Sequence, residues 1–577
     1  MSDVERDFDH EVDVLVVGSG AGGLVTAWTA KTRGLDVLVI EKAELYGGNS
    51  ALSGGGAWMP NAPEFLRQGQ RDDPERVFAY LRAIAPEVAP ERHHRYLDEV
   101  TKLAAALEAT PAFRNGFFWA KGYSDYHPEK GGSPLGRGLW AAPIDRRELK
   151  EDGAALRGGT SRIPGAPRGM WLTSVDFHAL THLRWSGWSG KRTLLRLAWR
   201  TIQARRQGLV MMTSGAALIT RLRLLLRAEG IPLWLQTPMR SLITDGDGAV
   251  IGVQAERDGT TLRIRARRGV MMATGGFESS EEMRDRYQPA VGKGWSSGSP
   301  DNTGDGIRAG QTVGGALDLM DDAWWMPAMQ VPGGVWPLVA ERAYPEQFIV
   351  NSAGRRFVNE ASPYTDFVHA QLEGHATGVS HIPVFMIIDH HGWTHNIIAG
   401  HLPGLPINKE WLASGLVQRA DTIAELAGLI GVPPDALTDT AERFNQFARN
   451  ARDDDFHRGE SAYDRYYGNP DYPNPNLGEV KEPPFYAFRL VPGDLGTKGG
   501  LLTDENARVL REDGTAIAGL YATGNASAAV MGHDYAGPGA TIGPAMTFGW
   551  VGAQHMAAGP QSARSDEALV VSGDRDR

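Results

Sequence analysis

The sequence contains no cysteine. This absence excludes disulfides, thiolate metal sites and a cysteine nucleophile. Long apolar runs are also missing: no stretch of about 20 apolar residues is present, so we expect no segment that spans a bilayer. Residues 1–9 are acidic and lack an apolar core, which is not typical of a secretory signal. These absences together lead us to expect a cytoplasmic protein.

An excess of positive charge is absent as well. The chain has 59 Lys and Arg residues against 69 Asp and Glu residues, a formal net charge of -10, and this balance argues against nucleic-acid binding. The paired histidines 93–94 and 390–391 lack the spacing that places two ligands on one helical face, and the acidic residues 453–455 lack the alternating oxygen ligands of a cation loop. We therefore expect no metal site.

Glycine, by contrast, is abundant. The chain has 71 glycines, and they cluster at residues 18–23, 47–56, 275–276, 493–500 and 537–543. Because glycine lets the backbone approach a ligand closely, five separate clusters indicate one long ligand that passes several loops. A length of 577 residues exceeds what one hydrophobic core supports, so we expect two or more domains.

The beginning of the chain has the pattern of a βαβ unit. Residues 12–17 form a β-branched run, residues 22–33 are predicted to be a helix, and residues 36–40 a second strand. Gly18, Gly20 and Gly23 give G-x-G-x-x-G at the strand-to-helix turn, and Glu41 ends the second strand. In a dinucleotide site the amino end of the helix binds the pyrophosphate and the acidic residue accepts from ribose hydroxyls. A glycine-rich turn without a ligand is the alternative, and the complete context disfavours it.

Later segments add strands to the same unit. Residues 250–253 and 261–265 resemble a hairpin, whereas residues 269–273 and 520–522 resemble strands that run into glycine loops. The predicted fold class is α/β (mixed α+β): a discontinuous Rossmann-like domain with a second domain inserted into it. We place the nucleotide-binding domain at residues 1–324 and 496–577, the inserted domain at 325–495, and an extra insert at 139–210. The polar tail, residues 564–577, is expected to be disordered.

Several motifs resemble one flavoprotein superfamily. Glu-Lys at 41–42, followed by Gly-Gly-Asn-Ser at 47–50, resembles the FAD-binding start of the fumarate reductase and ketosteroid dehydrogenase flavoproteins, and Ala-Thr-Gly-Gly-Phe at 273–277 resembles their second nucleotide loop. Gly-Asn at 524–525 and the run VMGHDYAGPGATIGPAMTFG at 530–549 closely resemble the signature of 3-ketosteroid Δ1-dehydrogenases.

Further matches lie at 349–367, 442–445, 455–459 and 492–500, so the resemblance covers most of the chain except 139–210. One departure is Asp534, where the family pattern has a threonine before the tyrosine.

The resemblance implies FAD as the cofactor, and the absence of cysteine excludes a cysteinyl link to it. We expect FAD to be bound non-covalently by the domain formed by residues 1–324 and 496–577. The residues expected to bind it are Gly18, Ser19, Gly20, Gly23, Glu41, Lys42, Gly48, Asn49, Ser50, Ser53, Gly54, Gly55, Ala273, Thr274, Gly275, Gly524, Asn525, Thr541 and Ile542. The inserted domain at 325–495 would then be the catalytic domain.

The resemblance also implies an activity, the FAD-dependent 1,2-dehydrogenation of 3-ketosteroids in steroid degradation. The C2 proton leaves to a base and the C1 hydride leaves to flavin N5. Tyr535 and the amide of Gly539 would donate to the C3 oxygen, since a phenol stays protonated at pH 7 and a developing enolate needs placed donors. Tyr364 would be the base and Tyr126 its assistant, with Tyr123 as the alternative to Tyr126. A neutral phenol is a poor base, so Tyr364 needs such help.

Three alternatives stay open at this stage. A ketosteroid dehydrogenase that acts at C4–C5 shares the same tyrosine logic. A fumarate reductase-like enzyme needs arginines for two carboxylates, and the sequence has none between residues 524 and 560. A non-catalytic flavin redox carrier would need neither the base nor the oxygen donors.

The insert contains a basic amphipathic segment at residues 185–206. Arg192, Arg196 and Arg200 recur every four residues on one predicted side, with Leu194, Leu197, Ala198 and Ile202 on the other. Tryptophans and such a helix suit a membrane surface, and a helix packed on the flavin domain with a solvated basic face is the alternative. The expected partners are a 3-ketosteroid, an electron acceptor (quinone-like or another) and, peripherally, lipid of the inner membrane face.

Overall fold

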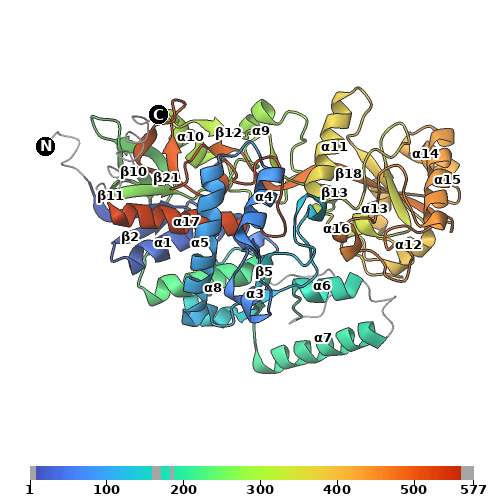
Figure 1. Cartoon of the computed structure of the whole chain (residues 1–577), viewed down its shortest axis with the longest axis horizontal. Coiled ribbons are helices and arrows are strands. Elements are labelled where there is room, and N and C mark those ends of the chain that lie inside the picture. The colour runs from blue at the N-terminus through green and yellow to red at the C-terminus, as the bar shows by residue number, and fades with distance from the viewer. Residues whose placement is uncertain (1–7, 159–169, 182–187, 560–577) are drawn as a thin grey trace.

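The computed structural model describes residues 8–158, 170–181 and 188–559 (Figure 1). Its larger sheet has eight strands, six of them in the order β20-β21-β11-β1-β2-β8, and β10 and β9 extend it from β11. The bounds of these strands are β1 His10–Val17, β2 Val37–Ile40, β8 Leu233–Trp234, β9 Met239–Thr244, β10 Val250–Arg257, β11 Thr260–Met272, β20 Arg508–Leu510 and β21 Ala516–Ala522.

The predicted βαβ unit is confirmed. β1 pairs parallel with β2, and α1 (Ala21–Thr32) connects them. α1 is buried along residues 21–30, because it packs on β1 and β2 and is flanked by α17 (Ile542–Ala558) and α8 (Ser214–Ala228), and α17 itself contacts β11 and β21 of the same sheet. α1 and α17 touch closely: a Cβ on Gly549 would lie 2.5 Å from the Gly22 carbonyl oxygen. A helix buried on all sides needs no polar face, which explains its run of small and apolar residues.

The predicted strands at 261–265 and 269–273 are one strand, β11, so their separation in the prediction is wrong. Residues 260–265 of β11 pair antiparallel with β10, residues 264–272 pair parallel with β1, and residues 270–272 pair parallel with β21. The register against β1 shifts between Val12 and Val14, where Arg267 and Arg268 are exposed. This bulge interrupts the apolar pattern without ending the strand.

The second large sheet lies at the other end of the molecule (Figure 1). Its order is β14-β13-β18-β16-β15, and β17 also pairs with β18. The bounds are β13 Ala323–Val331, β14 Gly334–Pro337, β15 Gln347–Val350, β16 Val384–Ile388, β17 Val417–Ala420 and β18 Phe485–Thr497. The predicted domain limits, 325 and 495, fall within two residues of the ends of β13 and β18. This position supports the division, which stays a prediction.

Smaller elements complete the described chain. The remaining strands are β3 Gly56–Trp58, β4 Phe117–Trp119, β5 Gly138–Ala141, β6 Ile144–Asp145, β7 Met211–Met212, β12 Leu317–Asp318 and β19 Gly500–Leu501. The remaining helices are α2 Gly48–Leu52, α3 Pro63–Arg67, α4 Pro74–Ile84, α5 Pro90–Glu108, α6 Ser174–Thr181, α7 Trp188–Gln207, α8 Ser214–Ala228, α9 Glu281–Tyr287, α10 Asp305–Thr312, α11 Tyr364–Ala376, α12 His390–His395, α13 Lys409–Ala413, α14 Ile423–Ile430, α15 Pro434–Asn450 and α16 Ala462–Tyr466.

The insert, residues 139–210, includes most of β5, then β6, α6 and α7, and Figure 1 shows α7 along one edge of the molecule, outside α6. The predicted helix is present, and Leu197 of its predicted apolar side is buried, but Leu194 and Ile202 of that side are exposed. Arg196 and Arg200 form ion pairs with Asp176, at 2.8 and 2.9 Å, although the Arg196 side chain stays 52% exposed. The predicted basic side is therefore paired in part and not wholly solvated. None of the helices in the described ranges is long and apolar enough to cross a membrane. Trp185 and the predicted polar tail lie outside the described residues.

Candidate active site

A cavity of about 610 Å³ runs from the β1–α1 turn to the second sheet. Every residue that the sequence predicted for cofactor binding or catalysis lines it. These residues come from five separate parts of the chain, the segments around 18–55, 126, 273–275, 364 and 524–542. Their roles remain predictions, but the fold brings all of them to one place.

The glycine turn at one end of the cavity is tightly built. Gly18 directly follows β1 with a φ of 106°, and a Cβ there would lie 2.2 Å from the Ala273 carbonyl oxygen. The residues of the first turn of α1 line the cavity, which places its backbone N–H groups where an anion binds. At the end of β2, the Glu41 carboxylate accepts from the Ser19 amide at 3.1 Å and the Ser19 hydroxyl at 2.6 Å. This donor set and the close backbone contacts fit a dinucleotide.

The Gly-Gly-Asn-Ser loop connects this end to the second sheet. Asn49 Nδ2 donates to Glu278 Oε1 at 2.6 Å and to the Leu495 carbonyl at 3.2 Å. Asn302 also donates to Glu278 Oε1, at 2.7 Å, while Oε2 has no partner among the described atoms. Burial, with the nearby charge of Asp494, raises the pKa of Glu278 to about 7. Nothing in the sequence pattern singled out Glu278, because its partners come from distant segments.

Three buried tyrosines stand together at the other end of the cavity. The Tyr126 hydroxyl donates to the Tyr364 oxygen at 2.6 Å. The ring centroids of Tyr126 and Tyr535 lie 5.0 Å apart, and those of Tyr364 and Tyr535 lie 5.6 Å apart. Tyr123, the alternative to Tyr126, lies in the cavity wall and stacks on Tyr466 with centroids 4.5 Å apart. The short hydroxyl contact to Tyr364 therefore favours Tyr126 over Tyr123.

Each tyrosine is held by its own segment. The loop that carries Tyr126 wraps around the buried Asp125, which accepts from Trp58 Nε1 at 2.8 Å and from the Ser133 amide at 2.9 Å. Tyr364 begins α11, and the loop before it is fixed by Arg342, which donates to the carbonyls of Glu360 and Ser362.

The Tyr535 hydroxyl lies 2.9 Å from the Thr541 hydroxyl, and its ring meets Trp324 edge to face. The tyrosine is thus fixed at both its ring and its oxygen.

Burial sets the protonation of the three tyrosines. It raises the pKa of Tyr126 and Tyr364 well above the ordinary value and raises that of Tyr535 as well. For Tyr364, neighbouring tyrosines raise the pKa further, whereas the hydrogen bond from Tyr126 lowers it. All three hydroxyls are therefore neutral at pH 7. The hydrogen bond from Tyr126 is the contact that favours the ionised form of Tyr364.

Gly539 lies where its chain passes β3. Its φ is 89°, and a Cβ would lie 2.4 Å from both the Ala57 nitrogen and the Gly56 carbonyl carbon. Its carbonyl accepts from the Trp58 amide at 3.0 Å, so the strand holds this loop. A side chain at this position would push the loop away from the cavity.

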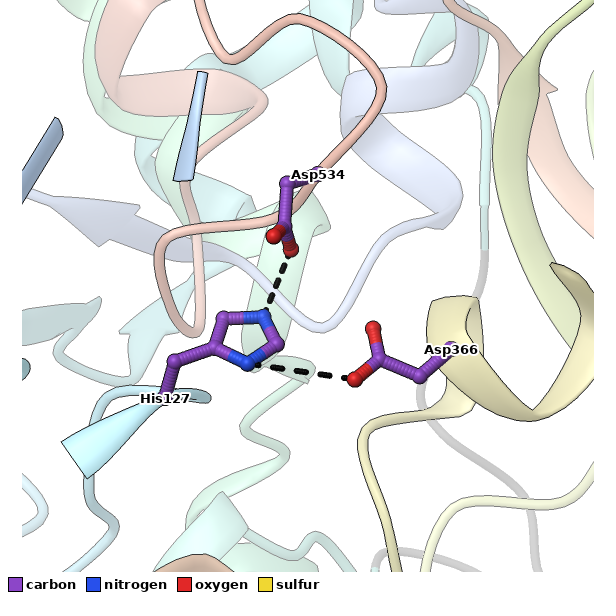
Figure 2. Close-up of side chains that lie close together, drawn as sticks. All are labelled: His127, Asp366 and Asp534. Atoms are coloured by element: carbon purple, nitrogen blue, oxygen red, sulfur yellow. Dashed lines mark hydrogen bonds and ion pairs between the residues drawn. The ribbon is translucent and has the colours of Figure 1, made fainter. Parts of the chain in front are cut away.

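Figure 2 shows a charged cluster formed by His127, Asp366 and Asp534. Each of these residues lies within two positions of one of the three tyrosines in the sequence. Their ligand atoms lie within 4.8 Å of one another, so this group could offer ligands to a metal ion, which the sequence pattern did not predict. Asp534 is the residue that departs from the family pattern. It also accepts from the backbone amide of Tyr535 at 2.7 Å.

Part of the cavity wall was not predicted from the sequence. It includes Trp140, Leu172, Thr173, Ser174 and Phe177 from the insert, together with Met326, Trp336 and Val339. They are mostly apolar, a kind of residue that carries no motif. Arg157 is the one arginine among the described residues of the lining, and it forms an ion pair with Asp301.

Comparison with known proteins identifies the family of this chain. The family model described as an FAD binding domain matches residues 13–542. A 3-oxosteroid 1-dehydrogenase of Mycobacterium tuberculosis is 47% identical over 563 residues, which cover 95% of this chain and 98% of that protein. This chain belongs to the 3-ketosteroid Δ1-dehydrogenase family.

Two further family members extend the comparison. The 3-oxosteroid 1-dehydrogenase of Mycolicibacterium smegmatis is 44% identical over 572 residues, with 96% of this chain and 99% of that protein covered. The crystal structure of 3-ketosteroid Δ1-dehydrogenase from Sterolibacterium denitrificans, in complex with 1,4-androstadiene-3,17-dione, is similar with a TM-score of 0.87 and 39% identity, and covers 95% of this chain and all of that one. The predicted family, fold class and FAD cofactor are confirmed.

Proposed function

We propose that this enzyme introduces a C1–C2 double bond into a 3-ketosteroid, with FAD as the hydride acceptor. The observation that carries this proposal is the hydroxyl pair of Tyr126 and Tyr364, 2.6 Å apart, beside Tyr535 in the cavity that also holds the dinucleotide turn. A base and an oxygen donor thus lie next to each other within reach of one bound ring. The family's 1-dehydrogenases act on the same substrate class.

Proton removal falls to Tyr364. Tyr364 acts as a phenolate after its own proton has passed to solvent, and Tyr126 donates to the negative oxygen. The C2–H bond then breaks as its proton passes to that oxygen and its electron pair forms the enolate. Because burial keeps Tyr364 neutral at rest, the two hydroxyls have to act as a pair. A single buried phenol would lack any group to share the charge.

Tyr535 and the Gly539 amide act on the C3 oxygen. A neutral phenol and a backbone N–H donate more strongly to an enolate than to a ketone, so they lower the barrier rather than tighten ground-state binding. Thr541 keeps the Tyr535 hydroxyl oriented. FAD, when bound by the glycine turn and the Gly-Gly-Asn-Ser loop, accepts the C1 hydride.

The charge of the cavity disfavours a dicarboxylate substrate. A fumarate site needs arginines that converge on two carboxylates. Among the described lining residues, Arg157 is paired with Asp301 and Lys42 with Asp305, at 2.6 Å for the lysine. Neither cation is therefore free to bind a dicarboxylate. The apolar wall instead suits a steroid skeleton.

Anaerobic mixing with steroid tests the activity directly. Androst-4-ene-3,17-dione should bleach the oxidised flavin spectrum of the holoenzyme, and Tyr364→Phe should abolish bleaching while the product 1,4-androstadiene-3,17-dione still binds. Tyr126→Phe should slow the same step less severely. Tyr287→Phe, on α9 and away from the cavity, is the matched control. Bleaching only by 5α-reduced ketones would indicate a dehydrogenase that acts at C4–C5. The absence of bleaching would favour a non-catalytic flavin redox carrier.

We also propose that α7 contacts a membrane surface. Its outer face is apolar: the exposed fractions are 45% for Leu194, 69% for Leu195, 61% for Trp199 and 49% for Ile202. Leu197 and Thr201 face inward. An exposed apolar strip of this kind on a helix at the molecular edge is characteristic of interfacial helices.

Basic residues at both ends of the strip suit an anionic bilayer. Lys191 and Arg192 precede it and Arg205 and Arg206 follow it, all of them exposed. Each such charge contributes about 1 kcal/mol near an anionic surface. α6, which packs on α7, contributes Ser174 and Phe177 to the cavity wall, so the lipid-facing helix lies next to the steroid cavity. A lipid-soluble substrate would meet the enzyme at this edge.

Co-sedimentation with anionic vesicles at low salt tests this contact. Wild-type protein should pellet, and the combined change Leu195→Ser, Trp199→Ser and Ile202→Ser should keep it in the supernatant. Leu429→Ser on α14, at an equally exposed leucine, is the control. Changing Arg196 or Arg200 is a poorer test, because it breaks the ion pairs with Asp176. Wild-type protein that stays in the supernatant contradicts the proposal.

A further inference from the structure

The charged cluster in Figure 2 has a buried histidine at its centre. The His127 side chain is 2% exposed, and its Nε2 lies 2.6 Å from Asp534 Oδ1. Its Nδ1 lies 3.4 Å from Glu129 Oε1 and 3.8 Å from Asp366 Oδ2. Both ring nitrogens therefore face carboxylates, and only the doubly protonated imidazolium can donate to both sides.

Each member of the cluster adjoins one of the three tyrosines. His127 follows Tyr126 directly, and Asp534 precedes Tyr535 and accepts its amide. Asp366 lies in the first turn of α11, which begins at Tyr364. A backbone hydrogen bond of 3.1 Å from Tyr126 to the Ala536 carbonyl adds a second link between two of these segments. The cluster thus joins the three chain segments that carry the site.

The charges around His127 hold its proton. Although burial lowers the pKa of His127, hydrogen bonds with Asp534 and Glu129 and the charge of Asp366 raise it to about 9. The same contact with His127 lowers the pKa of Asp534 to about 2, against its burial. Lys130 lies 3.3 Å from Asp534 Oδ2, and His369 on α11 acts on the Asp366 carboxylate. At pH 7 an ionised pair, His127 with Asp534, lies beside the tyrosines.

A metal ion fits this arrangement less well than a proton does. A cation needs lone pairs that converge on one point. Figure 2 shows Asp534 and Asp366 facing different nitrogens of the ring, so a cation on either nitrogen would meet one carboxylate and leave the other. An imidazolium suits the geometry as it stands, because its Nε2–H donates to Asp534 and its Nδ1–H faces Asp366 at ion-pair distance.

We propose that His127, clamped between Asp534 and Asp366, is a positioning residue that sets the spacing of Tyr126, Tyr364 and Tyr535. The inference rests on the proposed roles of these tyrosines. A loss of the clamp would let the three segments drift apart, and displacement of a catalytic group by about 1 Å can cost about 100-fold in rate. The loss of the clamp should lower the rate of proton removal and leave the apolar contacts that bind the steroid unchanged.

His127→Gln is the main test, since glutamine keeps one hydrogen bond and removes the charge. We expect kcat to fall about 10- to 100-fold, with FAD content and product binding (followed by the flavin spectrum) changed less than about two-fold. Asp534→Asn, which keeps an acceptor for the Tyr535 amide, should lower kcat in the same way. Lys130→Ala, which removes the exposed partner of Asp534 and leaves the clamp, is the matched control and should keep wild-type kcat.

A pH series separates positioning from a general loss of stability. The rate advantage of wild type over His127→Gln should be full at pH 7 and shrink as the pH rises through about 9, where the imidazolium is lost. A ratio that does not change with pH, or equal kcat in the two proteins, overturns the inference. So does a loss of wild-type kcat in EDTA, which would identify a bound metal. If wild type itself fails to bleach with androst-4-ene-3,17-dione, the proposed function fails instead.

Discussion

The Tyr535 side chain meets two requirements of a hydrogen-bond donor to the substrate: it keeps its proton and it is fixed in place. Burial raises its pKa, so the phenol keeps its proton, and Thr541 and Trp324 fix its oxygen and ring. A fixed and neutral donor costs no reorganisation when charge develops on the substrate oxygen. The residue is therefore suited to an effect on rate.

Replacing Tyr535 with Phe should lower the rate of flavin bleaching by a factor on the order of 100 or more, as the loss of one oxyanion donor usually does. Product binding should change by no more than a few-fold, since the ring remains in place. Stopped-flow bleaching and a binding titration measure the two quantities. A change confined to affinity would contradict this role.

The contribution of Glu278 to the free energy of unfolding should depend on pH. Its folded pKa of about 7 lies above the ordinary 4.5, so its contribution to stability is full below about 4.5 and is lost as the pH rises through 7. Glu278→Gln keeps an acceptor for Asn49 and Asn302 and cannot ionise. Relative to wild type, the free energy of unfolding of this variant should therefore rise between pH 5 and pH 8, by roughly 3 kcal/mol at most.

Urea unfolding of the holoenzyme at the two pH values measures this difference. The comparison cancels the contributions of all other titrating groups, because they are the same in both proteins. An unchanged difference between pH 5 and pH 8 would show that folding does not raise the pKa of Glu278.

At the scale of elements, the loop before α11 depends on a buried ion network. Glu360 is fully buried and pairs with Arg356 at 2.7 Å and with Arg458 at 3.1 Å. Arg356 also pairs with Asp453 at 2.7 Å. The carboxylate thus neutralises two buried guanidinium groups four residues before Tyr364.

Glu360→Gln should lower the free energy of unfolding by about 3–5 kcal/mol, the usual cost of leaving a buried charge unpaired. The nearby exposed pair of Arg355 with Asp439 is a matched control. Asp439→Asn should cost less than about 1 kcal/mol. Chemical denaturation compares the two, and equal small effects would mean that the network contributes little.

The β1–α1–β2 unit should determine how much FAD the protein retains. Glu41→Arg removes the carboxylate that accepts from Ser19 and places a cation beside the glycine turn, so FAD content should fall. Glu44→Arg, three residues on and exposed, should retain FAD. The ratio of flavin to protein absorbance in the purified variants is the measurement. Equal FAD content in both variants would contradict the assignment of Glu41.

These elements also show what the sequence could predict. The βαβ unit was predictable because β-branched runs and glycine spacing are local signals, and the tyrosines came from the family resemblance. The ion pairs of Asp176 were not predictable, so the pattern of α7 indicated an amphipathic helix but not that Arg196 and Arg200 are paired or that Leu194 and Ile202 are exposed. Glu278 and His127 were missed for the same reason: their partners lie tens to hundreds of residues away, and no local pattern records such contacts.

At the scale of the whole molecule, the cofactor cavity is shared by segments from both ends of the chain and from the second sheet. Asn49 joins these parts through Glu278 and Leu495. A ligand in such a cavity contacts segments that unfolding would separate. Its binding energy is therefore available to the native state alone.

Removal of FAD should consequently lower stability over most of the chain. Free FAD at 100 times its dissociation constant should raise the free energy of unfolding by about 2.7 kcal/mol over the apoprotein. Urea unfolding at increasing FAD concentrations measures this, with reconstitution as the control for damage. A midpoint that does not depend on FAD concentration would place the cofactor outside the cooperative core.

The central place of β11 has a consequence for how the chain is made. β11 lies between β1 and β21, and its partner β21 follows it by more than 240 residues (Thr260–Met272 against Ala516–Ala522). At about 5–20 residues per second, a ribosome needs on the order of ten to fifty seconds to cover that distance. During this time the edge of β11 that will bind β21 stays open, and the second sheet is completed when β18 emerges. The nucleotide sheet, although it contains the first strand of the chain, is therefore the last to close.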